Sequence, residues 1–237
     1  MDMVKSMKII IADAKSLKEK HFPIEKQTPL FFNKAEYLRK QLKELNIDQI
    51  HDLMKISFKQ SSLIYDYFHN EETFAALNLF DGVVFKQLDL KNYQKEQWDY
   101  LQKHLLINSP LYGILRYNDA VSYHRLEIKH KINELNLYTY WQDEINTYLK
   151  DEDVILSLST KEYEKMISHK MIQLDFVIRS GHTFKRNAVY LKKARGRMLN
   201  YLIEHRIEDI EKIKEIVIDD YHFSKNDSND GHWVFIK

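Results

Sequence analysis

Cysteine is absent from the 237-residue sequence, and glycine and proline are scarce, with 5 and 3 residues. Without cysteine the protein has no disulfide framework, no cysteine-ligated zinc, no protein-held iron–sulfur cluster and no thiol peroxidase chemistry. The scarcity of glycine and proline, with no low-complexity tract and no internal repeat, leaves nothing that marks a linker. We therefore expect a single domain over residues 1–237.

Long apolar runs are also missing. No window approaches 18 apolar residues, and the N-terminus lacks an apolar run followed by a small-residue cleavage site. These absences predict a cytoplasmic protein without a membrane partner. Apolar residues still make up 44% of the chain, which is enough to fill a sizeable core.

The common signatures of nucleotide hydrolysis, dinucleotide binding, α/β-hydrolases and zinc proteases do not occur. A di-iron carboxylate bundle needs two Glu-x-x-His motifs, and the chain has one, Glu127-Ile-Lys-His130, in a segment predicted as a strand. The eleven histidines are dispersed. We expect no metal site, no cofactor and no direct iron storage.

Alternating strand and helix patterns predict an α+β, mixed α/β class, with a mixed sheet surrounded by helices. Two or three short helices are expected within 33–69, and one helix over 91–104 that ends in 105–107. Further helices are expected at 137–149, at 160–167 and from about residue 191. Strands are expected at 8–12, 121–128, 154–158 and 233–236, with a hairpin formed by 171–181 and 182–190.

Positive charge is concentrated in one segment. Lys and Arg (36) nearly balance Asp and Glu (35), yet residues 185–197 hold six basic residues and no acidic one. At 100° per residue, Leu191, Ala194, Met198 and Leu202 form the core stripe of the helix that begins near 191. The outward-facing residues are then Lys192, Lys193, Gly196 and Arg197, with Arg195 at the edge of the core.

Gly196 is unexpected there, since glycine inside a helix costs about 1 kcal/mol relative to alanine. Close approach by a phosphate or by another backbone would explain it. The alternative is a solvated helix face whose glycine contacts a neighbouring loop.

Lys15 and Ser16 follow the predicted strand 8–12, so they lie at a strand end that faces whatever crevice the sheet forms. Lys15 has three interpretations: an anion clamp, which we favour, a Schiff-base nucleophile, or a surface lysine in a salt bridge. Glu127 is a candidate general base or arginine partner.

Several ordered blocks resemble the bacterial YaaA family of peroxide-stress resistance proteins over nearly the whole chain. The blocks are 8–11 (KIII), 14–17 (AKSL), Phe80 with Gly82, 111–116 (LYGILR) with Asp119, 125–127 (RLE), 137–138 (LY) with Trp141, 162–163 (EY), and 192–196 (KKARG) with Met198 and Tyr201. The chain departs from the family pattern at Ala12-Asp13, where Ser-Pro is usual. The family usually begins near Met7, so residues 1–6 are interpreted as an extension.

The resemblance implies a bacterial protein induced by hydrogen peroxide that limits iron-dependent (Fenton) damage. It also implies a DNA-binding domain with a helix-hairpin-helix-like element and a basic cleft. The cleft residues would be Lys15, Arg116, Arg125, Lys192, Lys193 and Arg195. Ser16, Gly196 and Arg197 join this predicted anion-binding set because they lie in the same blocks or helix.

Three functions remain open from the sequence. The leading hypothesis is DNA binding with low sequence specificity. The second is an enzyme that acts on a small anionic metabolite or a damaged base, in a cleft with Lys15, Arg116, Arg125 and Glu127. The third is an interaction protein whose basic helix meets an acidic partner.

Overall fold

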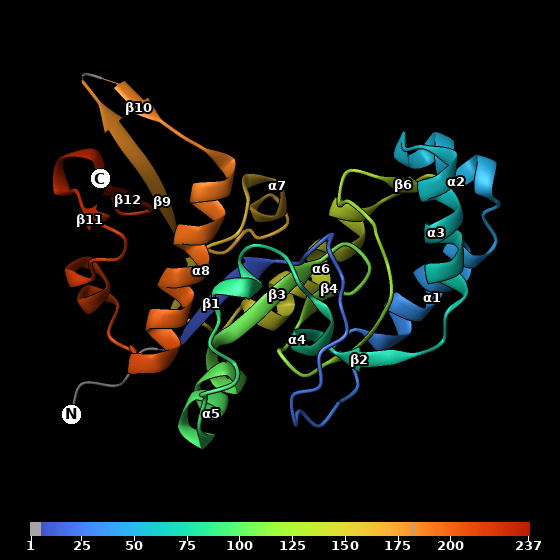
Figure 1. Ribbon diagram of the computed structural model, residues 1–237, viewed down its shortest axis with the longest axis horizontal. Coiled ribbons are helices and arrows are strands. Elements are labelled where there is room, and N and C mark those ends of the chain that lie inside the picture. The colour runs from blue at the N-terminus through green and yellow to red at the C-terminus, as the bar shows by residue number, and fades with distance from the viewer. Residues whose placement is uncertain (1–5, 182) are drawn as a thin grey trace.

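A mixed sheet lies at the centre of the computed structural model, which describes residues 6–181 and 183–237 (Figure 1). Five strands run parallel in the order β12–β9–β8–β1–β3, and antiparallel strands follow at the edges, β11 beside β12 and β4 beside β3. The strands are β1 (Met7–Ala12), β3 (Leu105–Ser109), β4 (Gly113–Leu115), β8 (Val154–Ser157), β9 (Met171–Ser180), β11 (His222–Phe223) and β12 (His232–Ile236). The predicted mixed α/β class is confirmed.

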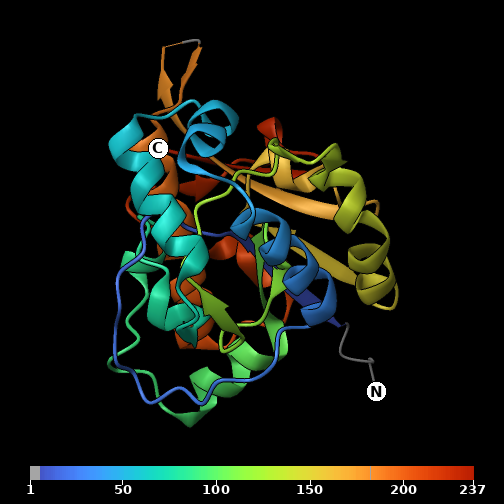
Figure 2. The same cartoon turned by 90° about the vertical axis from the view of Figure 1, so that its right-hand side faces the viewer.

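Helices cover both faces of the sheet. The helices α5 (Lys95–His104) and α8 (Ala188–His205) pack on one face, and α6 (Leu137–Leu149) lies on the other (Figures 1 and 2). Beyond β4, at the end of the molecule farthest from β12, α1 (Phe32–Lys43), α2 (Ile47–Met54) and α3 (Phe58–His69) pack together. No helix among the described residues is long and apolar enough to cross a membrane.

Short elements complete the chain. The short helices are α4 (Ala76–Leu79), α7 (Lys161–Glu164), η1 (Phe85–Gln87), η2 (Ile210–Glu215) and η3 (Lys225–Asp227). Two small antiparallel sheets pair β2 (Thr73–Ala75) with β5 (Ala120–Ser122), and β6 (Lys131–Ile132) with β7 (Leu135–Asn136).

The central strands are apolar because both of their faces are covered. Ile9, Ile10 and Ile11 of β1 are fully buried, as expected for a parallel strand between two helical layers. All of β3 is buried as well. The prediction that 105–107 continues a helix was wrong: α5 ends at His104, and the apolar run that follows is β3, paired with β1. A short apolar run has no period that distinguishes a buried strand from a buried helix end.

The segment 121–128 was predicted as a strand, and this was also wrong beyond β5. Leu126 and Ile128 are buried while Glu127 is partly exposed, so burial alternates as expected for extended chain. The ladder ends at Ser122, however, where the pairing with β2 ends. The alternating pattern therefore predicted which side chains face the core, but it did not show whether a neighbouring strand pairs with this segment.

The predicted hairpin is confirmed in β9 and β10 (Thr183–Lys185), which pair antiparallel and project beyond the body of the molecule (Figures 1 and 2). Its second strand is shorter than predicted because Asn187 caps α8, its side chain accepting from the N–H groups of Val189 and Tyr190. His182 and residues 1–5 of the predicted extension at 1–6 lie outside the described residues.

Candidate functional site

A cavity of about 380 Å³ opens at the carboxyl ends of β1 and β8. The chain passes from β1 to β3 on one side and later returns to β8 on the other side of β1. Strand order therefore reverses at β1, and in open α/β sheets ligands bind in the crevice outside the strand ends at such a reversal. We call this space the switch-point cavity.

Side chains of both charges line the switch-point cavity, together with Ser16, Thr160, Tyr163 and an apolar wall. The charged ones are Asp13, Lys15, Glu127, Glu162, Lys192 and Arg195. Five of the predicted site residues therefore lie around one space, namely Lys15, Ser16, Glu127, Lys192 and Arg195.

Arg195 is largely buried, and its guanidinium, whose Nε is fully buried, has no partner among the described residues. The residue is 8% exposed, and no described group forms a hydrogen bond or an ion pair with it. Burial lowers the pKa of the group, but a guanidinium remains charged at neutral pH. Leaving a buried charge unpaired costs on the order of several kcal/mol. An anion in the cavity would offset that cost.

Two carboxylates act on Arg195 electrostatically, but other donors already bind them. Glu164 accepts from the Ser157 hydroxyl at 2.6 Å and from the Gln173 amide at 3.1 Å. Asp175 pairs with Arg186 at 2.7 Å. Neither lies within ion-pair distance of Arg195, so these carboxylates leave it available to a ligand.

Asp13 lines the cavity beside two aromatic neighbours, of which one donates a hydrogen bond to it. The Tyr163 hydroxyl donates to Asp13 Oδ1 at 2.8 Å, and burial together with the Asp13 carboxylate raises the pKa of that hydroxyl, which keeps it protonated. His124 Nε2 lies 3.8 Å from Asp13 Oδ2 and has no hydrogen-bond partner. Because His124 Nδ1 lies 2.8 Å from the Ser122 carbonyl, we assign the proton to Nδ1.

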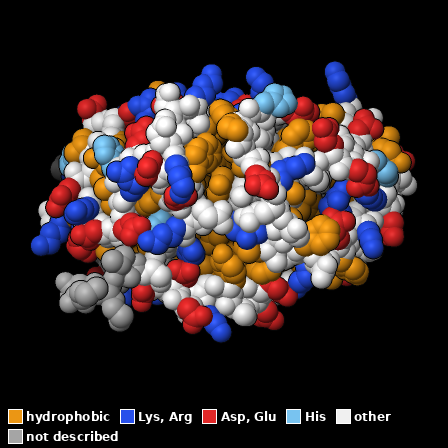
Figure 3. Space-filling model, turned by 90° about the horizontal axis from the view of Figure 1, so that it is seen from below, with side chains coloured by type: hydrophobic (Ala, Val, Ile, Leu, Met, Phe, Trp, Pro, Cys, Tyr) orange, Lys and Arg blue, Asp and Glu red, His pale blue; other side chains and the backbone are white. Residues whose placement is uncertain are grey.

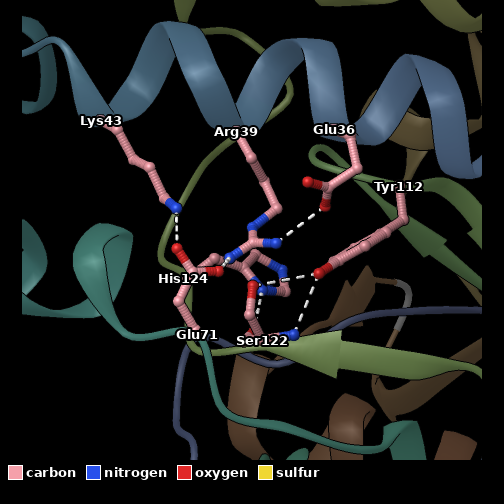
Figure 4. A network of polar contacts seen from close by, with 7 residues as sticks. All are labelled: Glu36, Arg39, Lys43, Glu71, Tyr112, Ser122 and His124. Atoms are coloured by element: carbon pink, nitrogen blue, oxygen red, sulfur yellow. Dashed lines mark hydrogen bonds and ion pairs between the residues drawn. The ribbon is translucent and has the colours of Figure 1, made fainter.

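A polar network fixes the segment that carries His124 (Figure 4). The Tyr112 hydroxyl accepts the Ser122 backbone N–H at 2.9 Å and contacts the Ser122 hydroxyl at 3.1 Å. Beside it, Arg39 of α1 bridges Glu36 at 2.7 Å and Glu71 at 3.0 Å. The Tyr112 contacts hold the end of β5 at Ser122, two residues before His124.

Lys15 forms an ion pair with Glu127, with Nζ 2.7 Å from Oε1. Burial alone would raise the pKa of Glu127, but hydrogen bonds from Lys15 and Lys129 lower it to about 2. Lys15 is thus an exposed lysine in a salt bridge, the third of its three interpretations from the sequence, and Glu127 occupies its Nζ, which disfavours both a Schiff-base nucleophile and a free anion clamp.

This ion pair makes a pH-dependent contribution to stability. The pKa of Glu127 lies below its ordinary value of 4.5, so the contribution is complete above about pH 4.5 and is lost as the pH falls toward 2. We expect Glu127→Gln to lower the free energy of unfolding by about 1 kcal/mol at pH 7, because the pair is partly exposed. Urea denaturation at pH 7 and pH 3 should show this difference shrinking at pH 3, and a difference that grows on acidification would contradict the assignment.

Four other predicted residues lie elsewhere. Arg116 binds the buried Asp119 and the Thr28 carbonyl, and Arg197 pairs with Asp219. Arg125 is partly exposed and forms no hydrogen bond or ion pair with the described residues. Lys193 is exposed on α8. None of them lines the switch-point cavity.

Gly196 was predicted on the outward side of α8, and this was wrong, because it is buried against η1. A Cβ at this position would lie 2.5 Å from the Val84 carbonyl oxygen and 2.7 Å from Gln87 Cγ. Of the explanations considered for this glycine, the structure supports close approach of another backbone. The same close packing brings the 82–85 loop, which lines the cavity, against α8.

Three cavity residues were missed as site candidates: Asp13, Glu162 and Tyr163. Signals for them existed in the sequence, since Asp13 directly follows an apolar strand and the other two form one of the family-like blocks. Within residues 6–181 and 183–237, no group of three or more His, Asp or Glu side chains is arranged to hold a metal ion.

A second surface lies on the hairpin and the first turns of α8. It combines two exposed aromatic side chains, Phe184 (40%) and Tyr190 (52%), with three exposed lysines, Lys185, Lys192 and Lys193. We call it the hairpin–helix surface. In the described part of the chain these lysines have no ion-pair partner, whereas Arg186 and Arg197 do. By contrast, the face in Figure 3 intersperses both charges with apolar side chains.

The chain is similar in sequence to one protein family along most of its length. A family model described as peroxide stress protein YaaA matches residues 7–227. A UPF0246 protein of Fusobacterium nucleatum is 31% identical over 245 residues, covering 98% of this chain and 99% of the relative. UPF0246 proteins of Finegoldia magna (34%, covering 98% of each chain) and Francisella philomiragia (33%, covering 98% and 100%) are similar along the same length.

Proposed function

Because the chain belongs to the family of peroxide stress protein YaaA, we propose that it binds DNA through the hairpin–helix surface and so helps to limit iron-dependent damage to DNA. The observation that carries the proposal is the set of three exposed lysines without ion-pair partners among the described residues, in a segment, 184–193, that also holds two exposed aromatic rings. Lysines neutralise phosphates regardless of sequence, so binding has low sequence specificity.

The aromatic rings favour DNA with unpaired bases. Phe184 and Tyr190 are both large and exposed, and bases stack on such rings with about 1–3 kcal/mol per base. Duplex DNA keeps its bases stacked inside and uses only the lysines. Single-stranded DNA should therefore bind more tightly than duplex of the same length.

A helix-hairpin-helix-like element is part of this proposal but not its basis. The helices α2 and α3 are joined by three residues, 55–57, and pack against each other. The connection is Lys-Ile-Ser and contains no glycine, so it lacks the residue that most readily lets a phosphate approach the backbone. We therefore place the principal contacts on the hairpin–helix surface.

Removing either Lys192 or Lys193 is expected to weaken binding to every DNA sequence alike and to flatten the plot of log affinity against log salt by about one unit. Fluorescence anisotropy with single-stranded and duplex DNA at two ionic strengths measures both effects. The matched control is Lys150→Ala, an exposed lysine at the end of α6 on the other face of the sheet. The proposal is wrong if the protein does not bind DNA at low salt, or if the control variant loses as much DNA affinity as the Lys192 and Lys193 variants.

A second candidate function is an enzyme or binding protein for a small anionic ligand, and the switch-point cavity favours it. Its buried Arg195 has no partner in the described chain, and Asp13 in the same lining offers a carboxylate as a candidate general base. The Schiff-base version is tested by borohydride trapping with carbonyl or abasic substrates. We expect no adduct on Lys15, and an adduct lost in Lys15→Ala would reverse that assignment.

A further inference from the structure

Two of the three cations that line the switch-point cavity come from one helix, and the carboxylates come from other elements. Lys192 and Arg195 are three residues apart on α8, so they lie on the same side of that helix. Asp13 follows β1, and Glu162 belongs to α7. The remaining cation, Lys15, is already paired with Glu127. An occupant therefore meets two cations that the described residues leave unpaired, and carboxylates from other elements.

Two unpaired cations match a dianion better than a monoanion. A phosphate monoester carries about −1.5 to −2 charge near pH 7, whereas a carboxylate carries a single charge. The planar fork of an arginine suits bidentate contacts with phosphate oxygens, and a lysine adds a compact point charge. The ligand group that fits Lys192 and Arg195 is therefore a phosphate monoester.

The other residues that line the cavity indicate which chemical groups the rest of the ligand carries. Asp13 and Glu162 accept hydrogen bonds, so they suit hydroxyl or amino groups. Ala14, Phe85 and Leu126 supply apolar surface for a flat or apolar body. The volume of about 380 Å³ falls within the range of small-molecule sites.

We propose that the switch-point cavity binds a nucleoside monophosphate unit, with its phosphate on Lys192 and Arg195 and its hydroxyl or amino groups toward Asp13 and Glu162. The inference rests on the second candidate function and names its ligand class. The unit is either a free nucleotide or the 5′-terminal nucleotide of a DNA strand, because both present the same chemistry.

Isothermal titration calorimetry with adenosine 5′-monophosphate on the full chain tests the proposal. We expect Lys192→Ala to weaken binding about tenfold or more, since a hydrogen bond between charged groups is lost. Lys150→Ala, which changes an exposed lysine at the end of α6 that does not line the cavity, should leave affinity within about twofold, because it contacts no part of the ligand. Adenosine and inorganic phosphate alone should bind far more weakly than the monophosphate.

Arg195→Met keeps an apolar stem and removes the charge, and it should abolish binding of the monophosphate. Its fold is checked by circular dichroism, and the exposed Lys192 provides an independent variant should Arg195→Met fail to fold. No heat of binding with wild-type protein, or equal losses in Lys192→Ala and Lys150→Ala, overturns the cavity assignment.

Competition distinguishes the two sources and separates this inference from DNA-backbone binding. Displacement of the monophosphate by a 5′-phosphorylated oligonucleotide, but not by its 5′-hydroxyl counterpart, assigns the strand end. If neither oligonucleotide displaces the monophosphate, the ligand of the cavity is a free nucleotide. Lys192 belongs to both the cavity and the hairpin–helix surface, so equal displacement by both oligonucleotides is read together with Arg195→Met: if that variant also keeps its affinity for the monophosphate, the ligand lies on the hairpin–helix surface and the proposal is overturned. Protein that binds the monophosphate but no DNA retains this inference and removes the DNA proposal.

Discussion

Asp119→Ala is expected to lower the free energy of unfolding by about 3 kcal/mol, with a fall in melting temperature of about 6–12 °C. Asp119 is fully buried in the turn between β4 and β5, and its carboxylate accepts from the Arg116 backbone N–H and from Arg116 Nε, both at 2.9 Å. Alanine leaves the Arg116 guanidinium without its ion partner. We expect the lower part of the range for broken buried pairs, because the Arg116 side chain is 21% exposed.

The matched control is Asp99→Ala, which removes a carboxylate from an exposed helical ion pair with Lys95 and should change melting little. Arg116→Ala completes the comparison. If Arg116 serves mainly to hold this turn, its variant melts lower and the folded protein binds DNA normally. An Arg116→Ala protein that melts like wild type and loses DNA affinity would return Arg116 to the binding surface.

Gly196→Ala is expected to lower the free energy of unfolding by about 2 kcal/mol, because overpacking of up to about 3 kcal/mol exceeds a helix-propensity gain of about 1 kcal/mol. The added Cβ would lie 2.5 Å from the Val84 carbonyl oxygen. That atom is backbone, so either η1 or α8 must shift as a unit. Melting followed by circular dichroism measures the effect, expected as a fall of about 4–8 °C.

Gly231→Ala is the control, since a Cβ there meets Met171 O at 3.5 Å, which is ordinary contact. It should stay within about 0.5 kcal/mol of wild type. A Gly196→Ala protein that melts higher than wild type would show that η1 yields freely. In that case the 82–85 loop would not be a firm wall of the switch-point cavity.

The local pattern of apolar and polar residues was sufficient to predict much of the fold. The strands β1, β8 and β12, the helix α6 and the β9–β10 hairpin follow from apolar runs, helical spacing and a turn at Ser180-Gly181. The core stripe of α8 was also predictable, since Ala194, Met198 and Leu202 are buried as their phase requires. Such signals are carried by neighbours in the chain, so the sequence displays them directly.

Part of the candidate site was predictable for the same reason. Lys15 and Ser16 follow a buried strand, and Lys192 and Arg195 lie in a basic, family-like block. That these residues surround one cavity with Asp13 and Tyr163 depends on which strands become neighbours. β8 pairs with β1 across about 145 residues of intervening chain, and no local pattern encodes that pairing.

By itself, then, the sequence determined the mixed α/β class, most of the central strands and the family-like blocks, because each depends on residue type and short-range spacing. Only the tertiary structure decided that 105–109 is a strand, that Gly196 packs on a backbone, and that Arg195 is buried without a partner among the described residues. The sequence could not show the burial of Gly196 because the spacing of apolar residues along a helix identifies only one buried face. The helix α8 is covered on two sides, by β9 and by η1. The second cover, contributed by a segment about 110 residues away in the chain, turns an apparently outward Gly196 into a buried contact.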